Sequence, residues 1–477
     1  MIDEERMPLL AFGIHADTGL PLETGGMGQH EQHQSAAESL LGQTVGAAFP
    51  DRAHLGLQFG FDADQLSESG WGLIFAANRD SAPHLAALAP LIELRRRQAG
   101  GTLRIFAGPD GYRQGESASG WLNRHGSSLD MINPDLGMPY YLVLIGSPEA
   151  IPFEFQYALD LVAGVGRLDF PTLEEFTAYA DSVVAHETDA TRKTARRIEL
   201  FATRHDFDRA TQLFIKHVAT PFGTGTGSLG PLGEKYRFAL NSSLSEQATK
   251  ACLSHLLSAP HNPPSLLITG THGMAFQAGD PRLAEHQGAL VCQDWPAYGD
   301  ITHEHWFAAQ DIPEHANVHG MIHLFFACYG AGTPAFDNFH SDADRVRIAP
   351  HAMTARLPQK LMTLPQGGVL ASLGHIDRVW ASSFLSEIGM AQPQRFRDVI
   401  HRLLSGQRVG MATDAFNGQW GVLSTRLLEK LNNKLNGQAV PAAELLALQI
   451  ARDDIRNYVV LGDPAVRLKP EQDHVSG

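Results

Sequence analysis

The residues best suited to chemistry are a histidine and a cysteine, each placed after a short apolar run. Ser265–Thr269 has the composition of a buried strand and is soon followed by His272, while the run Met321–Ala327 leads directly into Cys328. Parallel strands deliver the residues beyond their carboxyl ends to one edge of a sheet, so we expect this histidine and cysteine to lie close together. A thiolate is the nucleophilic form of cysteine, and a nearby imidazole moves its proton. The pair therefore predicts thiol catalysis.

Backbone amides beside this pair would complete such a site. Gly273 and Cys328 are the natural N–H donors to a developing oxyanion, and Gly330 and Gly332 would let a substrate backbone approach closely. Each residue alone has a structural interpretation, because a cysteine at a strand end often packs as a small hydrophobe. Similarly, a histidine before glycine is typical of a turn. The joint placement at successive strand ends favours the catalytic interpretation.

The surrounding elements alternate between apolar strands and helical patterns. We expect strands at 72–77, 102–107, 140–145, 197–203, 236–240, 265–269, 321–327, 368–373 and 458–461, and helices at 84–98, from about 208, at 246–258 and near 352–363. Strands that are apolar on both faces favour a mostly parallel sheet covered on both sides. We predict an α/β fold with an N-terminal extension or pro-segment at 1–65, an α/β subdomain at 66–190 and a catalytic subdomain at 191–477.

Composition excludes several classes of function. The 477 residues include 37 Lys and Arg against 52 Asp and Glu, a net charge of −15, which disfavours nucleic acid as a partner. Three cysteines cannot form a disulfide framework and fit a reducing compartment. The longest apolar runs are far shorter than the ~20 residues of a membrane helix, and the start lacks a secretory pattern. We expect a cytoplasmic protein without membrane contact.

The chain resembles the caspase-like cysteine peptidases of clan CD, and more closely their gingipain and CHAT branches than true caspases. The resemblance rests on the His272-Gly273 and Ala327-Cys328 motifs and on the stretches 144–146, 164–168, 173–176, 368–377, 396–410 and 460–468. It covers about residues 70–470 and implies a caspase- or gingipain-like three-layer α-β-α fold. It further implies that Cys328 is the nucleophile, that His272 is its acid/base partner, and that the amides of Gly273 and Cys328 form the oxyanion hole.

The implied activity is that of a bacterial-type cysteine endopeptidase that cuts a specific protein substrate through a thioester, without a cofactor. Activation of a defence effector by such a cut is compatible with the resemblance. A cytoplasmic peptidase requires control, by a pro-segment, by a regulatory or activating partner, or by the polar loop 331–350 that follows the proposed nucleophile. We interpret that loop as a gate, because long loops in compact domains are often functional.

Substrate preference is left open by the sequence. The loops expected to line the pocket offer Arg204, Asp206 and Asp208, and then His375, Asp377, Arg378 and Trp380. A buried carboxylate would select Lys or Arg, and a buried guanidinium would select an acidic residue, but both signs are present. The alternative is that these charges form solvated loop faces or helix caps. Caspases carry Gln two residues before the nucleophile, whereas Phe326 stands here, so caspase-type aspartate specificity is not implied.

Two other functions compete with the peptidase interpretation. The first is a catalytically inactive scaffold with a caspase-like fold. The second is a metal-dependent α/β hydrolase, suggested by the cluster of His303, His305, His315, His319 and His323, in which His-x-His spacing suits two zinc ligands. A Cys pair or a tightly spaced third ligand is not evident, so we predict no metal site.

Overall fold

The computed structural model describes residues 10–22, 56–226, 229–258, 262–339, 346–386 and 390–471. Their central feature is a ten-stranded sheet in the order β3-β2-β4-β5-β16-β15-β12-β8-β6-β7. Its strands are β2 (Trp71–Phe75), β3 (Leu103–Phe106), β4 (Tyr141–Ile145), β5 (Gly164–Leu168), β6 (Ala195–Ala202), β7 (Ala239–Leu244), β8 (Pro264–Gly270), β12 (Ile322–Phe326), β15 (Ala371–His375) and β16 (Tyr458–Gly462). Most neighbouring pairs are parallel, which confirms the predicted mostly parallel α/β fold.

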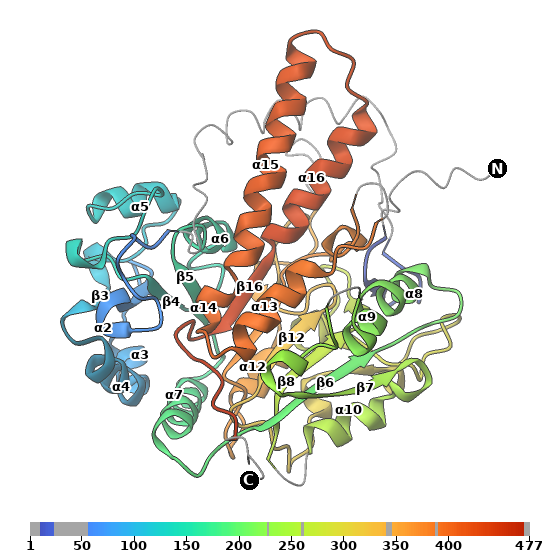
Figure 1. Cartoon of the computed structure of the whole chain (residues 1–477), viewed down its shortest axis with the longest axis horizontal. Coiled ribbons are helices and arrows are strands. Elements are labelled where there is room, and N and C mark those ends of the chain that lie inside the picture. The colour runs from blue at the N-terminus through green and yellow to red at the C-terminus, as the bar shows by residue number, and fades with distance from the viewer. Residues whose placement is uncertain are drawn as a thin grey trace.

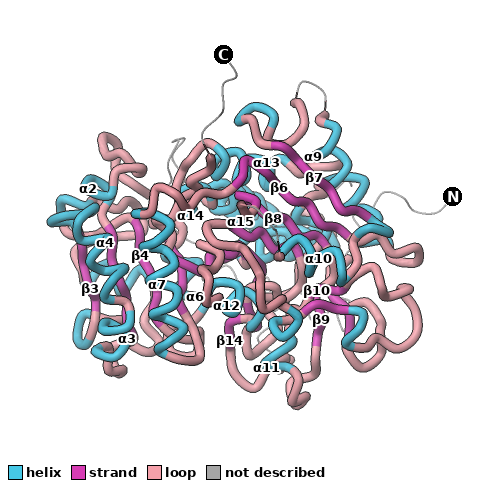
Figure 2. Tube along the Cα trace, turned by 90° about the horizontal axis from the view of Figure 1, so that it is seen from below, coloured by secondary structure: helices cyan, strands magenta, loops and turns pink. Residues whose placement is uncertain are grey.

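Helices cover both faces of the sheet (Figures 1 and 2). They are α2 (Leu66–Ser69), α3 (Ala82–Ala87), α4 (Ala89–Ala99), α5 (Ala118–Arg124), α6 (Phe153–Leu159), α7 (Leu173–Thr188), α8 (Arg209–Phe214), α9 (Thr220–Thr224), α10 (Lys250–Leu257), α11 (Leu283–His286), α12 (Arg356–Met362), α13 (Gln394–Leu404), α14 (Val409–Ala412), α15 (Asp414–Leu435) and α16 (Ala442–Arg456). The last two form a hairpin that projects from the body in Figure 1. Among the described residues, no helix combines the length and apolar character needed to cross a bilayer.

The strand sequences follow from this double coverage. Every residue of β2 and of β4 is buried, because both faces of these strands pack against helices. The strand β5 reads Gly-Val-Gly-Arg-Leu and lacks an apolar run, so its sequence did not predict a strand. Its Arg167 is fully buried and donates to Gln156 and to the carbonyl oxygen of Ile151. These hydrogen bonds satisfy the guanidinium inside the protein.

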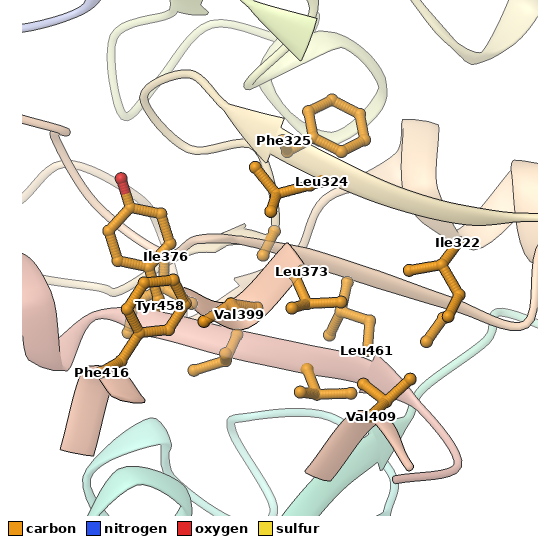
Figure 3. Packing of buried hydrophobic residues seen from close by; sticks show 14 of the residues in the cluster. Ile322, Leu324, Phe325, Leu373, Ile376, Val399, Val409, Phe416, Tyr458 and Leu461 are labelled. Carbon is orange, nitrogen blue, oxygen red and sulfur yellow. The ribbon is translucent and has the colours of Figure 1, made fainter. Parts of the chain in front are cut away.

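The strand β16 joins the two halves of the sheet. It pairs in parallel with β5 and antiparallel with β15, so the strands of the first half run opposite to those of the second. In Figure 3, Tyr458 and Leu461 of β16 lie in the same cluster as Leu373 of β15 and Phe416 of α15. The rings of Tyr458 and Phe416 stack with centroids 4.9 Å apart. The boundary that we predicted near residue 190 falls between α7 and β6, and the two parts share this sheet.

A second, small sheet lies beside the carboxyl end of β8. Its order is β1-β9-β10-β11, with β1 (Gly13–His15), β9 (Gly273–Ala275), β10 (Leu290–Val291) and β11 (Trp306–Phe307). A two-stranded ribbon is formed by β13 (Gly332–Thr333) and β14 (Met353–Thr354). The strand β13 lies within the predicted gating loop 331–350 and β14 follows that loop, of which residues 340–345 fall outside the described residues. The small sheet brings residues 10–22, called segment 10–22 below, against the predicted site.

A buried ion pair ties α4 to the turn after β16, and its loss should be costly. Arg95 donates to Asp463 at 2.8 Å, and Asp463 also accepts from the Trp71 indole at 3.0 Å. Asp463→Ala should lower the free energy of unfolding by about 3–5 kcal/mol, because the guanidinium stays buried with one carboxylate fewer.

Urea denaturation followed by circular dichroism checks this prediction. The matched control is Glu93→Ala, since Glu93 lies on the same helix but its side chain is 51% exposed in its pair with Arg96. That change should cost less than about 1 kcal/mol. Equal losses in the two variants would contradict a structural role for the buried pair.

Candidate active site

The registers of β8 and β12 bring His272 and Cys328 to one edge of the sheet. Phe326, the last residue of β12, is aligned with Gly270 of β8, and Thr271 then donates to the Phe326 carbonyl oxygen at 3.1 Å. The histidine and the cysteine each stand two residues beyond this aligned pair. A Cβ on Gly273 would overlap the Cys328 carbonyl oxygen. Only glycine therefore allows the two backbone segments to approach this closely.

The thiol of Cys328 is fully buried at this edge. Its Sγ accepts a hydrogen bond from the Val379 N–H at 3.2 Å, and burial raises the pKa of the thiol. The next residue, Tyr329, has a φ of 59°, a left-handed conformation that is uncommon for a residue with a side chain. Its N–H donates to the Asp377 carbonyl oxygen at 2.9 Å. The turn after Cys328 is therefore held by the segment that follows β15.

The imidazole of His272 is held by a carboxylate. Its Nε2 lies 2.8 Å from Oδ2 of Asp208, and both side chains are buried. Burial opposes ionisation of this carboxyl group, but the nearby His272 and the hydrogen bonds from His272 and Thr211 outweigh it and lower the pKa of Asp208. Asp208 also caps α8 by accepting from Ala210 and Thr211. It therefore stays charged and fixes the ring orientation.

The other ring nitrogen of His272 is left for a reacting group. Nδ1 is buried and has no hydrogen-bond partner among the residues that the structure describes. The same residues give no hydrogen bond between His272 and Cys328. Hydrogen bonds between catalytic groups are often long in an apo structure and tighten in the reacting complex, so this geometry is compatible with proton transfer between the two side chains.

Two backbone amides converge on a single carbonyl oxygen beside these side chains. The N–H groups of Gly273 and Cys328 donate to the carbonyl oxygen of Phe12, at 2.9 and 3.0 Å. Paired amide donors at one carbonyl oxygen are the arrangement that stabilises an oxyanion in acyl transfer. The carbonyl comes from segment 10–22, which is far away in the sequence.

Residues 10–15 of segment 10–22 cross the site and pair with backbone on either side of it. Before the bound carbonyl, Ala11 pairs antiparallel with Trp380, the Phe12 N–H donates to Val379 O at 2.9 Å, and Ala381 donates to Leu10 O at 3.0 Å. After it, β1 pairs in parallel with β9, with Gly13 opposite Gly273. The backbone is therefore held on both sides of the two amides.

The side chain of Phe12 fills a pocket made of aromatic rings. It is fully buried, and its centroid lies 4.8 Å from Phe326, 5.8 Å from Phe384 and 6.1 Å from Phe214, each edge to face. The His272 ring lies 5.8 Å away on another side. We call these three phenyl rings the aromatic pocket. Their edge-to-face geometry is the one that aromatic pairs prefer.

The charged residues that we predicted near the pocket have other partners in the structure. Arg204, Asp206, Asp208 and Arg378 each form an ion pair or a hydrogen bond with another side chain of the protein. Arg204 and Asp206 form an ion pair of 3.1 Å on the surface, where the Asp206 side chain is 78% exposed. Asp208, also predicted as a pocket residue, contacts His272 through its carboxylate. Arg378 donates to both oxygens of Asp337, at 2.7 and 2.6 Å, and is buried with it.

The remaining predicted residues, His375, Asp377 and Trp380, are buried and lie in or directly after β15. His375 Nε2 donates to the Asp454 carbonyl oxygen at 2.9 Å, and Asp377 accepts from the Asn338 N–H at 3.0 Å. Burial is the main cause that raises the pKa of Asp377 to about 7, and the negative charge of nearby Asp337 adds to it. Trp380 is buried, and its backbone pairs with segment 10–22.

Asp454 of α16 is a residue that the sequence did not single out. Its carboxylate accepts from the Trp380 N–H at 3.0 Å and from the hydroxyls of Ser382 and Ser383 at 2.7 and 2.8 Å. The strand-like segment that pairs with residues 10–12 is thereby fixed to the helical hairpin. Phe12, Phe214 and Phe384 were missed as well. Two features of the sequence could have pointed to them. One is the apolar run around Phe12, and the other is Phe326, which stands where caspases carry Gln.

The histidines considered as zinc ligands do not converge. His303 contacts Asp311 at 3.0 Å, His319 contacts the Ser182 carbonyl oxygen at 3.0 Å, and His323 contacts Thr269 at 3.0 Å inside the sheet. Among the described residues, no group of three or more His, Cys, Asp or Glu side chains is arranged to hold a metal ion.

No family model matches the chain, and no curated protein matches it in sequence. The crystal structure of the Arg-specific cysteine proteinase gingipain R (RgpB) is similar with a TM-score of 0.48 and 12% identity, over 84% of this chain and 79% of that chain. The complex of Porphyromonas gingivalis RgpB pro- and mature domains gives 0.48 and 12%, over 84% and 80%. A structure named only as that of a protease gives 0.46 and 13%, over 85% and 80%. Likeness at this level assigns neither an activity nor site residues to this chain.

Proposed function

We propose that this chain is a cysteine endopeptidase that cuts a specific protein substrate through Cys328 and His272. The observation that carries the proposal is the convergence of two amides, those of Gly273 and Cys328, on one peptide carbonyl oxygen beside a thiol and an imidazole. A peptide carbonyl held in this way is activated for attack, because the developing negative charge meets N–H donors already in place.

The reaction follows from the positions of these groups. The Cys328 thiol passes its proton to His272, and the sulfur bonds to the carbonyl carbon of the substrate. The two amides stabilise the oxyanion until the C–N bond breaks, and the imidazolium then protonates the departing amine. Water hydrolyses the resulting thioester and returns the proton to the thiol. The charged Asp208 stabilises the imidazolium and holds the ring in place.

Covalent trapping of the thiol tests this proposal. The probe is a peptidyl acyloxymethyl ketone, which alkylates a cysteine that is activated within a peptide-binding site. It is applied to the full chain and to the full chain carrying Phe12→Asp, in which a charge in the aromatic pocket should displace segment 10–22. In the Phe12→Asp chain we expect one label, located at Cys328 by peptide mass mapping.

The other two cysteines serve as internal controls. Cys292 is buried and Cys252 is partly buried, and neither lies at the paired amides, so both should stay unlabelled. Labelling of Cys252 or Cys292 alone, or of no cysteine in either chain, would contradict the proposal. Absence of any label together with peptide binding would favour the inactive scaffold.

A further inference from the structure

We infer that the aromatic pocket selects an aromatic residue immediately before the cut bond, and that Phe12 occupies it in the resting chain, so that segment 10–22 blocks the site as an intramolecular substrate analogue. This inference rests on the proposed peptidase function. It adds a substrate class and a mode of control to that function.

The register of segment 10–22 identifies the residue before the cut bond. The carbonyl that enters the paired amides belongs to the residue on the amino side of the bond under attack, and that residue is Phe12. The residue on the other side is Gly13. A Cβ added to Gly13 would lie 3.1 Å from the Cβ of Cys328, so the cysteine side chain stands beside the Phe12–Gly13 bond. The segment is thus placed in the register of a substrate.

The chemistry of the aromatic pocket sets the preference. Phe214, Phe326 and Phe384 surround the Phe12 ring with their own rings, and all three are buried. A guanidinium or carboxylate in this place would lose its hydration among phenyl rings, and burial of an unpaired charge is strongly unfavourable. A phenyl or similar ring gains both burial and edge-to-face contacts.

The charged side chains that the sequence predicted near the pocket do not offset this preference. Asp208 is engaged by His272, and Arg378 is engaged by Asp337 at two oxygens. An arginine or an aspartate in the pocket would have to displace one of these partners to gain an ion pair. The pocket should therefore reject both charge signs.

The same contacts explain why the resting site is closed. Phe12, His272 and Cys328 are all fully buried, so an external peptide cannot reach the sulfur while the segment is in place. Beyond the paired amides, the fully buried Ile14 belongs to a second hydrophobic cluster with Met274, and Leu22 returns to donate its N–H to Gly13 O at 2.9 Å. An occupant on the same chain also competes at an effective concentration far above that of an added peptide.

Peptide hydrolysis by full-length variants tests the inference. The substrates are internally quenched decapeptides that differ only at the residue before the central bond, which is Phe, Arg or Asp. Phe12→Asp should raise kcat/KM for the Phe peptide at least about 10-fold over wild type, because the intramolecular competitor is removed. The Phe peptide should be preferred over the Arg and Asp peptides by at least about 100-fold, because either charge would be buried without a partner.

A change in the same segment that spares the aromatic pocket is the control. Leu20 is 58% exposed, so Leu20→Asp should leave the rate at the wild-type level. Phe12→Ala provides a second vacated pocket if Phe12→Asp does not give the native circular dichroism spectrum. A rise in kcat/KM for the Phe peptide in either folded Phe12 variant is sufficient.

The outcomes separate this inference from the peptidase proposal. A gain in a folded Phe12 variant together with preference for the Phe peptide supports the inference. Labelling of Cys328 without a gain in either folded Phe12 variant, or with preference for the Arg or Asp peptide, would overturn the inference and leave the peptidase in place. If no variant hydrolyses peptide and none is labelled at Cys328, the proposed function itself is contradicted.

Discussion

Replacing Cys328 with alanine should lower peptide hydrolysis by at least about 10⁴-fold, because the proposed acyl intermediate forms on its sulfur. The effect should appear in the wild-type background and in the Phe12→Asp background, in which the site is vacated. Single-turnover hydrolysis of the Phe decapeptide, measured with enzyme in excess, checks it. The substitution removes one buried sulfur and one acceptor for the Val379 N–H, so the fold should persist.

Cys252→Ala is the matched control for this prediction. Cys252 lies on α10, is partly buried and has no place at the paired amides, so its loss should leave the hydrolysis rate unchanged. Cys328→Ala with wild-type hydrolysis would show that the nucleophile lies elsewhere. Equal losses in both variants would indicate a general effect on folding.

Replacing His272 with alanine should lower kcat by about 10²–10⁴-fold, since the departing amine would leave without a proton donor. Asp208→Asn should have a smaller effect in the same direction, because the imidazole remains but loses the charge that stabilises its protonated form. Asparagine caps a helix as well as aspartate does, so this change leaves the start of α8 intact. Steady-state kinetics on the Phe decapeptide separate kcat from KM.

A surface histidine provides the comparison for His272. His255 is exposed on α10, and His255→Ala should leave kcat unchanged. A larger loss for Asp208→Asn than for His272→Ala would contradict the proposed order of roles. It would mean that the carboxylate acts mainly on the fold or directly on the substrate.

Most strands of the large sheet could be predicted because local composition determines them. The strand β4 is an uninterrupted apolar run, and β8 and β12 are mostly apolar, a pattern that burial on both faces favours. β5 could not be found in this way, because its glycines and Arg167 are explained by close backbone packing and by hydrogen bonds to distant residues. The antiparallel insertion of β16 between β5 and β15 is likewise a matter of long-range pairing.

In the candidate site too, local sequence identifies some residues, whereas others depend on long-range contacts. His272 and Cys328 follow strands and could be placed at one edge by topology alone. The partnership of Asp208 with His272, and that of Asp454 with the segment after β15, depend on three-dimensional contacts between residues 64 and 74 positions apart. Segment 10–22 has only a short apolar run to identify it. Its binding across the site depends on backbone hydrogen bonds, which any sequence can make, and on contacts between the Phe12 ring and rings far away in the sequence.

The position of β16 in the sheet has a consequence for the order of biosynthesis. Ribosomes release a chain from its N-terminus at about 5–20 residues per second, so β5 and β15 emerge well before the strand that separates them. Until residues 458–462 leave the exit tunnel, both flanking strands expose unpaired edges, which are sites for mispairing with other chains. Asp454, which accepts hydrogen bonds from the segment that follows β15, emerges only just ahead of β16. The contacts that hold the candidate site are therefore incomplete in a nascent chain until translation of this region is finished.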